Sequence, residues 1–323
     1  MQVLYLDPGH AAELVDPGDG PRPRGYYWLD IERTETGWSQ YANRWLDAHL
    51  HEAHLREASL VEGLNGRLPF YDGTDAYDLL VMRTLDVESP AEAPMTRPVA
   101  IFLTPRVVVS IRPPGDPVFA RLRERLLGGL RKAPGSTAAC FALLVNQIVG
   151  QLLDRRETVS ELVGQWQDDL LEHDQPFDEW RSLLRLRNHL RRLEDVSEAQ
   201  LDALSGWREQ TSLELDAAHQ GHFEALEKDL RRVFEHAAAM QSAIDSLVQT
   251  HYAIVGQQTN EILRVLTIIS VVFLPLNLIT GIFGMNFAHI PFLQSPYAPW
   301  LTVGLMGALA ALLFFWLGRR RWF

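Results

Sequence analysis

A stretch without charge near the C-terminus constrains the fold of this chain more than any other feature. From position 265 to position 318, 54 consecutive residues include no Asp, Glu, Lys or Arg. Two apolar runs lie inside it, at 265–283 and 299–317, and about 20 such residues cross the hydrocarbon core of a bilayer. Two helices buried in a soluble core would rarely lack charge over such a length, so we predict a hairpin of two transmembrane helices.

The basic residues that flank these runs predict the orientation of the hairpin. Arg264 precedes the first run and Arg319, Arg320 and Arg321 follow the second, whereas the loop between the runs has no Lys or Arg. Positive charge near the end of a span marks the cytoplasmic side. We therefore expect a multi-pass protein of the inner (cytoplasmic) membrane, with two spans and with both termini in the cytoplasm.

The residues before the hairpin form an acidic body. All 41 acidic residues and 27 of the 30 basic residues lie within positions 1–264, which gives this part a net charge of −14. Nucleic acid is excluded as the main partner, because binding phosphate along a backbone needs a basic face. The single cysteine, Cys140, allows no intrachain disulfide and is typical of a cytosolic body, and we expect no cleaved signal.

The first third of the chain has the pattern of an α/β domain, and a helical pattern follows it. The periodicity of residues 41–60 predicts a helix, and turn residues at 113–117 separate the two patterns. Short runs rich in β-branched and aromatic residues predict strands at 26–31, 78–83, 99–103 and 107–111. Further helices are predicted near 117–132, 136–172 and 177–205.

The fold class that we predict is an α/β N-terminal cytoplasmic domain, a long helical stalk and two C-terminal transmembrane helices, mainly α overall. The predicted boundaries are 1–115 for the α/β domain, 116–212 for a helical region, 213–264 for the stalk helix, 265–284 for the first transmembrane helix, 285–298 for the outer loop, 299–318 for the second transmembrane helix and 319–323 for the basic tail.

The stalk is predicted from an apolar period that continues into the membrane. Apolar residues recur every three or four positions from Phe223 to Ile254, and no proline occurs between Leu213 and Pro275. A single amphipathic helix from about 213 to 284 needs partner helices, and self-association around a central axis supplies them most simply. A membrane-tethered coiled coil without a pore would have the same pattern, so periodicity alone leaves both architectures open.

One face of the first span and of its cytoplasmic extension mixes polar and bulky aliphatic side chains without charge. Rings of such residues around an axis would alternate wet and dry layers, as in channels gated by hydrophobic constrictions. Alternatively, the hydroxyl groups bond carbonyls of their own helix and the amide bonds a neighbouring helix. By spacing of three or four, this pore stripe consists of Thr259, Leu263, Leu266, Ser270, Leu274 and Asn277, and Asn260 adds a further amide beside it.

Two features of the spans concern packing. Gly304, Gly307, Ala308 and Ala311 recur at helical spacing on the second span, and we predict that they pack against the first span. Pro275 leaves a backbone carbonyl of the first span without its helical partner, which is tolerable where that oxygen meets water or another helix.

The segment around the first span resembles a known family. Residues 259–269 read Thr-Asn-Glu-Ile-Leu-Arg-Val-Leu-Thr-Ile-Ile, and residues 273–287 read Phe-Leu-Pro-Leu-Asn-Leu-Ile-Thr-Gly-Ile-Phe-Gly-Met-Asn-Phe. Both closely resemble the C-terminal part of CorA-type metal transporters, whose signature is Gly-Met-Asn directly after the first of two C-terminal spans. The resemblance is specific from about 257 to 287 and covers the rest of the chain only in the order of its elements.

This resemblance implies a CorA-like funnel. Such a homopentamer lines its pore with the first spans and places the second spans in an outer ring. By resemblance, Gly284, Met285 and Asn286 form the outer mouth, where amide oxygens accept hydrogen bonds from the water around a cation. Asn277 lies where the family has a second polar ring, and the hydrophobic constriction corresponds to Leu263, Leu266 and Leu274.

The loop after the signature departs from the magnesium-transporting branch of that family. That branch usually has acidic residues there, whereas this chain has Ala288 and Phe292. The zinc-transporting ZntB branch also lacks those acids, and its soluble domain resembles this one more. We therefore favour zinc as the transported ion, with magnesium, cobalt or nickel as the alternative.

Histidines supply candidate metal ligands. Five copies of His289 at the outer mouth would offer imidazole nitrogen, which zinc favours, although an interfacial position against lipid headgroups is the alternative. Asp216, His219 and His222 recur at three-residue spacing at the start of the stalk. They predict a regulatory metal site at a subunit boundary, and a solvated helix face is the alternative.

The chain has no motif of an enzyme. It lacks a glycine-rich phosphate loop, Cys-x-x-Cys, His-Glu-x-x-His and Gly-x-Ser-x-Gly. We therefore expect no catalytic residues, no tightly bound cofactor and transport along the electrochemical gradient. The expected partners are the transported divalent cation, the lipid bilayer and other copies of the chain. A membrane scaffold or metal sensor that keeps the fold without transport is the remaining alternative.

Overall fold

The structure is a computed structural model that describes residues 2–16, 22, 24–33, 38–50, 68–129, 132–171, 177, 179–285 and 297–319. The chain divides into two compact units, Met1–Leu247 and Val248–Phe323. The division falls within one long helix, α6 (Ala217–Gly284), which contributes to both units.

The first unit contains a seven-stranded sheet in the order β2-β1-β3-β7-β6-β5-β4. β3 and β7 pair in parallel, with Leu29 opposite Val109, and the other neighbouring strands are antiparallel. All four predicted strands are present, within β3, β5, β6 and β7, whereas β1, β2 and β4 were not predicted. The strands are β1 (Gln2–Leu6), β2 (Glu13–Leu14), β3 (Tyr26–Glu32), β4 (Phe70–Gly73), β5 (Asp78–Leu85), β6 (Thr96–Leu103) and β7 (Val107–Arg112).

Four helices pack together in the first unit: α3 (Pro117–Leu127), α4 (Thr137–Leu171), α5 (Trp180–Gln210) and the N-terminal part of α6. α3 begins after Asp116, whose carboxylate accepts the backbone N–H of Val118 at 2.9 Å. The rings of Phe141, Trp207 and Phe223 join α4, α5 and α6. They are fully buried, with centroids 4.6, 4.7 and 5.7 Å apart, so aromatic packing fastens the three helices to one another.

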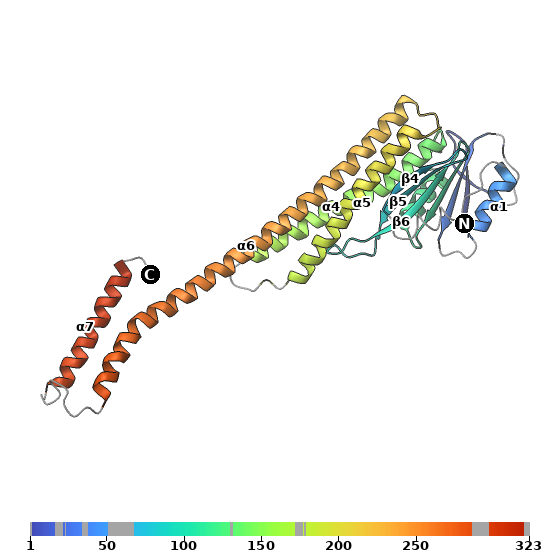
Figure 1. Cartoon of the computed structure of the whole chain (residues 1–323). Helices are drawn as coiled ribbons and strands as arrows, with labels where there is room; N and C mark the ends of the chain where they lie inside the picture. The colour runs from blue at the N-terminus through green and yellow to red at the C-terminus, as the bar shows by residue number, and fades with distance from the viewer. Residues whose placement is uncertain are drawn as a thin grey trace. The chain divides into compact units, whose positions relative to one another are not determined.

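Alternating side chains of the sheet enter two separate hydrophobic cores. In β3, Trp28 lies in the core shared with α3 to α6, and Leu29 lies in the core shared with α1 (Trp38–Leu50). Val108 and Val109 of β7 divide in the same way. Figure 1 shows α4, α5 and the first part of α6 together on one side of the sheet and α1 on the other. Because both faces are covered, the central strands are apolar at nearly every position.

α6 confirms the prediction of one helix that continues from the stalk into the first span, although it begins four residues later than position 213. Asp216 precedes it, and its carboxylate accepts the backbone N–H of His219 at 2.7 Å, which caps the helix start. The same hydrogen bond is the main reason why the pKa of Asp216 is lowered. The helix continues through Pro275 to Gly284, a length of 68 residues. The predicted helix at 41–60 is confirmed over residues 41–50, which lie within α1, and residues 51–60 lie outside the described residues.

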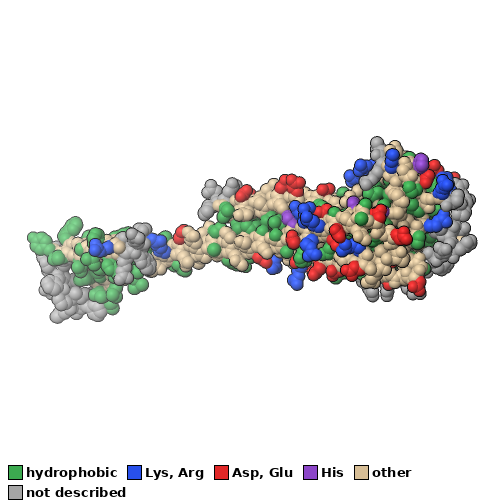
Figure 2. Space-filling model, turned by 90° about the horizontal axis from the view of Figure 1, so that it is seen from above, with side chains coloured by type: hydrophobic (Ala, Val, Ile, Leu, Met, Phe, Trp, Pro, Cys, Tyr) green, Lys and Arg blue, Asp and Glu red, His purple; other side chains and the backbone are tan. Residues whose placement is uncertain are grey.

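The second unit contains the C-terminal part of α6 and α7 (Ala298–Arg319). Three helices in the described part of the chain are long and apolar enough to span a membrane, and α4 is one of them. However, 61% of the apolar 18-residue stretch of α4 is buried inside the chain, against 6% for the corresponding stretches of α6 and α7. α4 is therefore a core helix, and the two candidate spans are the predicted ones. Figure 2 shows hydrophobic side chains over the visible face of these two helices.

α7 contacts α6 through a different face from the predicted one. The small residues of α7 are exposed in the single chain, and an added Cβ at Gly304 or Gly307 would meet nothing within 4 Å. Within one chain they therefore do not pack against the first span, contrary to the prediction. Large aliphatic side chains make the contact instead, and they bury more apolar area where two backbones do not approach closely. These side chains are Ile268, Val272 and Leu276 of α6 and Leu313 and Leu317 of α7.

Candidate ion pathway along the first membrane helix

The predicted pore stripe lies on the side of α6 that α7 leaves uncovered. All six of its residues are exposed in the single chain, and Leu263, Leu266 and Leu274 expose 52, 57 and 70% of their surface. At about 100° per residue, the stripe lies roughly opposite Ile268 and Val272, which contact α7. It extends for about 27 Å along the helix. Since it includes the exposed amide of Asn277, which lipid tails cannot satisfy, this row needs water or other protein beside it.

The hydroxyl groups of the pore stripe donate to carbonyls of their own helix. Thr259 Oγ1 donates to the carbonyl of Val255 at 2.8 Å, and Ser270 Oγ donates to the carbonyl of Leu266 at 2.8 Å. In the single chain these hydroxyls therefore bond carbonyls of their own helix, which was the alternative to a pore-lining role. It does not exclude a polar layer, because each hydroxyl oxygen keeps lone pairs that can accept hydrogen bonds from water. The two residues thus present oxygen rather than hydrogen to their surroundings.

The C-terminal end of α6 carries no charge within the described residues. The helix ends at Gly284, and the backbone N–H of Met285 donates to the carbonyl of Ile282 at 3.4 Å. Gly284 and Met285 are exposed in the single chain. Asn286 and His289, which were predicted at the mouth, lie outside the described residues. The described part of the predicted mouth therefore offers backbone groups and a thioether.

The charged groups near the pore stripe lie at its N-terminal end. Glu261 and Arg264 line a shallow groove together with Asn260, and Gln257 donates to Glu261 at 3.3 Å. Asn260 is about one quarter-turn away from the stripe, beside these charged groups. Asn260 therefore lies in the groove beside Glu261 and Arg264 rather than in line with Thr259.

Asp216, His219 and His222 do not form a metal site within one chain. Asp216 caps α6, and its carboxylate lies 2.7 Å from His219 Nδ1, whose ring also lies 3.3 Å from the hydroxyl of Ser136. In the part of the chain that the structure describes, no group of three or more His, Cys, Asp or Glu side chains is placed to hold a metal ion. A site at this position needs ligands from another subunit, and in that form it stays a prediction.

A second polar feature of the first unit was not predicted. Arg121 and Arg125 of α3 meet Arg155 of α4 around a cleft, although they are some 30 residues apart in the chain. Two signals were present in the sequence, a pair of arginines at a spacing of four and Gly150 in the middle of a helical segment. Neither signal indicates that the two helices are neighbours.

Known proteins are similar to this chain over nearly its whole length. A family model described as CorA-like Mg²⁺ transporter protein matches residues 23–320. The divalent cation transporter CmaX of Pseudomonas aeruginosa is 26% identical over 328 residues, which cover 99% of this chain and 91% of that protein.

Two solved structures share the fold. The CorA magnesium transporter of Methanocaldococcus jannaschii superposes with a TM-score of 0.86 at 16% identity, over 100% of this chain and 99% of that chain. The cytoplasmic domain of ZntB from Vibrio parahaemolyticus superposes with a TM-score of 0.62 at 13% identity, over 80% of this chain and 98% of that domain. The resemblance noted at the first span thus extends over nearly the whole chain, and it includes a ZntB-like neighbour. The chain belongs to the family of CorA-like Mg²⁺ transporter proteins.

Proposed function

We propose that the chain is one subunit of a homopentamer that conducts divalent cations through a central pore, with zinc favoured. As a member of the CorA-like family it is a transporter of divalent cations and not an enzyme. The observation that carries the proposal is the uncharged pore stripe of α6. It lies opposite the contact with α7 and is therefore free to face the same stripe of four other copies.

The chemistry of the pore stripe suits a hydrated cation. Oxygen atoms of Thr259, Ser270 and Asn277 would accept hydrogen bonds from water around the ion without replacing that water. The rings of Leu263, Leu266 and Leu274 between them would exclude water when the pore is narrow, and so act as the gate. A cation that gives up its water reluctantly would then pass only when the leucine rings widen.

The ion preference rests on the outer mouth. Gly284, Met285 and Asn286 would receive the cation, and five copies of His289 just beyond them would supply imidazole, which zinc prefers over magnesium. The loop has no acidic residue that would concentrate magnesium. Magnesium, cobalt or nickel is the second candidate, because the family is described by its Mg²⁺ transporters.

The driving force would be the electrochemical gradient. With both termini in the cytoplasm of an inner membrane, an inside-negative potential contributes about 4.6 kcal/mol per 100 mV to the entry of a divalent cation. No tightly bound cofactor is needed for such transport.

The test is metal flux into proteoliposomes, with zinc, magnesium, cobalt and nickel compared for wild type and Asn286→Ala. We expect zinc flux in the wild type and its loss in the variant. Val265→Ala, which changes an exposed residue off the pore stripe, is the control that keeps the flux. Flux of magnesium alone would contradict the zinc preference but would still support the proposed pore. No flux of any metal would contradict transport and favour the scaffold or metal-sensor alternative, motivated by the acid-free loop.

A further inference from the structure

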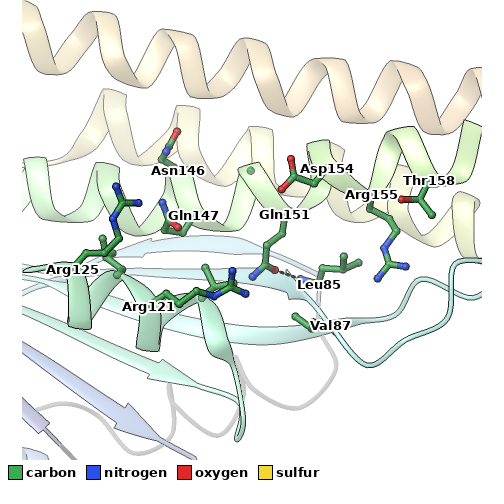
Figure 3. Close-up of a pocket in the computed structure, with 13 residues that line it drawn as sticks. Leu85, Val87, Arg121, Arg125, Asn146, Gln147, Gln151, Asp154, Arg155 and Thr158 are labelled. Carbon is green, nitrogen blue, oxygen red and sulfur yellow. Dashed lines mark hydrogen bonds between the residues drawn. The ribbon is translucent and has the colours of Figure 1, made fainter. Parts of the chain in front are cut away.

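A cleft of about 470 Å³ lies between α3 and α4, beside the loop that follows β5 (Figure 3). Three guanidinium groups line it, from Arg121 and Arg125 on successive turns of α3 and from Arg155 on α4. The only carboxylate among the lining residues is Asp154, which Figure 3 shows pointing away from Arg121. The cleft is therefore cationic, although residues 1–264 have a net charge of −14.

The three arginines are not neutralised by the protein. Arg121 Nε donates to the carbonyl of Pro117 at 3.3 Å, and Arg155 donates to the carbonyl of Ser89 at 3.3 Å. Both acceptors are neutral, and within the described ranges no carboxylate forms an ion pair with any of the three. Each guanidinium has five N–H donors, so several remain available to a ligand.

A buried amide of α4 also lacks an acceptor. The side-chain oxygen of Gln151 accepts the hydroxyl of Thr84 at 2.8 Å and the backbone N–H of Leu85 at 3.2 Å, which fixes the orientation of the amide. Its nitrogen, Nε2, is buried and has no hydrogen-bond partner in the protein. Figure 3 shows this nitrogen facing the guanidinium of Arg121. Two donors that face one another without an acceptor between them define a position for an anionic oxygen.

The wall of the cleft is kept open by a glycine. Gly150 lies in the middle of α4 and lines the cleft, and an added Cβ there would meet nothing within 4 Å. Glycine weakens a helix interior relative to alanine. No close neighbour accounts for the glycine, and a larger side chain at this position would occupy the cleft.

We propose that this cleft binds a small soluble anion that carries phosphate groups, of the size of a pyrophosphate or a nucleotide. Its volume lies in the range of small-molecule sites, about 300 to 1,000 Å³, and exceeds what a lone phosphate fills. The planar fork of arginine matches the oxygen atoms of a phosphate group. Three arginines against one aspartate leave an excess of two positive charges, which favours a multiply charged anion. The site lies in the first unit and is separate from the pore stripe.

Calorimetric titration of the full-length protein in detergent, at low salt and with EDTA, tests the proposal with sodium pyrophosphate and with ATP as probes. We expect both probes to bind, and Arg121→Gln and Arg125→Gln each to weaken binding about tenfold or more. Gly150→Leu should abolish binding while all three arginines remain, with no drop in the thermal unfolding midpoint. Arg185→Gln, at an exposed arginine of α5, is the matched control and should bind as the wild type does.

Three results would overturn the proposal. They are no heat with either probe, wild-type binding by both Arg121→Gln and Gly150→Leu, or equal affinity for citrate, which would remove the preference for phosphate. The assay involves no metal flux, so its failure and a failure of the proposed transport are distinguishable.

Discussion

At the scale of single residues, Asp78 joins the sheet to the helices. Its buried carboxylate accepts the hydroxyls of Tyr71 at 2.9 Å and Thr211 at 2.6 Å and the indole N–H of Trp207 at 3.1 Å. We expect Asp78→Ala to lower the free energy of unfolding by about 2–4 kcal/mol, because buried donors lose their acceptor. Thermal unfolding of the full-length protein measures this. Asp75→Ala, an exposed aspartate in the preceding turn, should change little, and an equal effect of the two variants would contradict the role of Asp78.

Cys140 should report on the integrity of the first unit. Burial raises the pKa of its thiol to about 12, so the thiolate is scarce at pH 8. We expect N-ethylmaleimide to leave the native protein unlabelled at pH 8 and to label it rapidly in urea. In urea, where the thiol is exposed, the rate of labelling should rise as the pH passes the ordinary thiol pKa of about 8.5, since deprotonation generates the reactive form. Fast labelling of native protein at pH 8, followed by mass spectrometry, would show that the thiol is accessible.

At the scale of elements, the pore stripe of α6 leads to a prediction about gating. Leu266→Asn should raise the resting flux of divalent cations several-fold, because a polar ring is wetted more easily than a leucine ring. Val265→Asn introduces the same side chain at an adjacent position that is equally exposed, at 56% against 57%, but lies away from the stripe. It should leave the resting flux unchanged. If both variants leak equally, the stripe does not face the pore, and proteoliposome flux with a zinc-sensitive dye decides between these outcomes.

At the scale of the whole molecule, the free pore stripe predicts an assembly. Five chains of 36.7 kDa should remain together in mild detergent, since the stripe needs partners that α7 does not supply. Native mass spectrometry measures the number of subunits directly. A monomer under conditions that preserve the fold would contradict the pentamer.

The distribution of basic residues predicts the topology of the same assembly. In a Cys140→Ala background, His289→Cys should react with a membrane-impermeant maleimide added outside intact cells, because the loop is predicted to face outward. Ser212→Cys, at an exposed position of the first unit, should react only after the membrane is opened. The reverse pattern of labelling would invert the predicted orientation.

The sequence alone was sufficient for the features that depend on local composition and period. The two spans could be predicted because a charged side chain in the hydrocarbon is costly, so a spanning segment lacks charge along its whole length. The long helix is readable because its apolar period continues from Phe223 onward without a proline before Pro275. The central strands are readable because both of their faces are buried, whereas the edge strands β2 and β4 are only two and four residues long and offer almost no pattern.

Only the tertiary structure decided which faces meet. The small residues at helical spacing on α7 predicted that their face would contact α6. In the single chain the leucines on the opposite face of α7 contact α6 instead. Which face of α7 makes the contact depends on the shape of α6 as well. The three acceptor bonds of Asp78 join residues up to 133 positions apart, and the arginines around the cleft come from two helices. Such contacts depend on how separate elements pack in three dimensions, and no period within one segment encodes that packing.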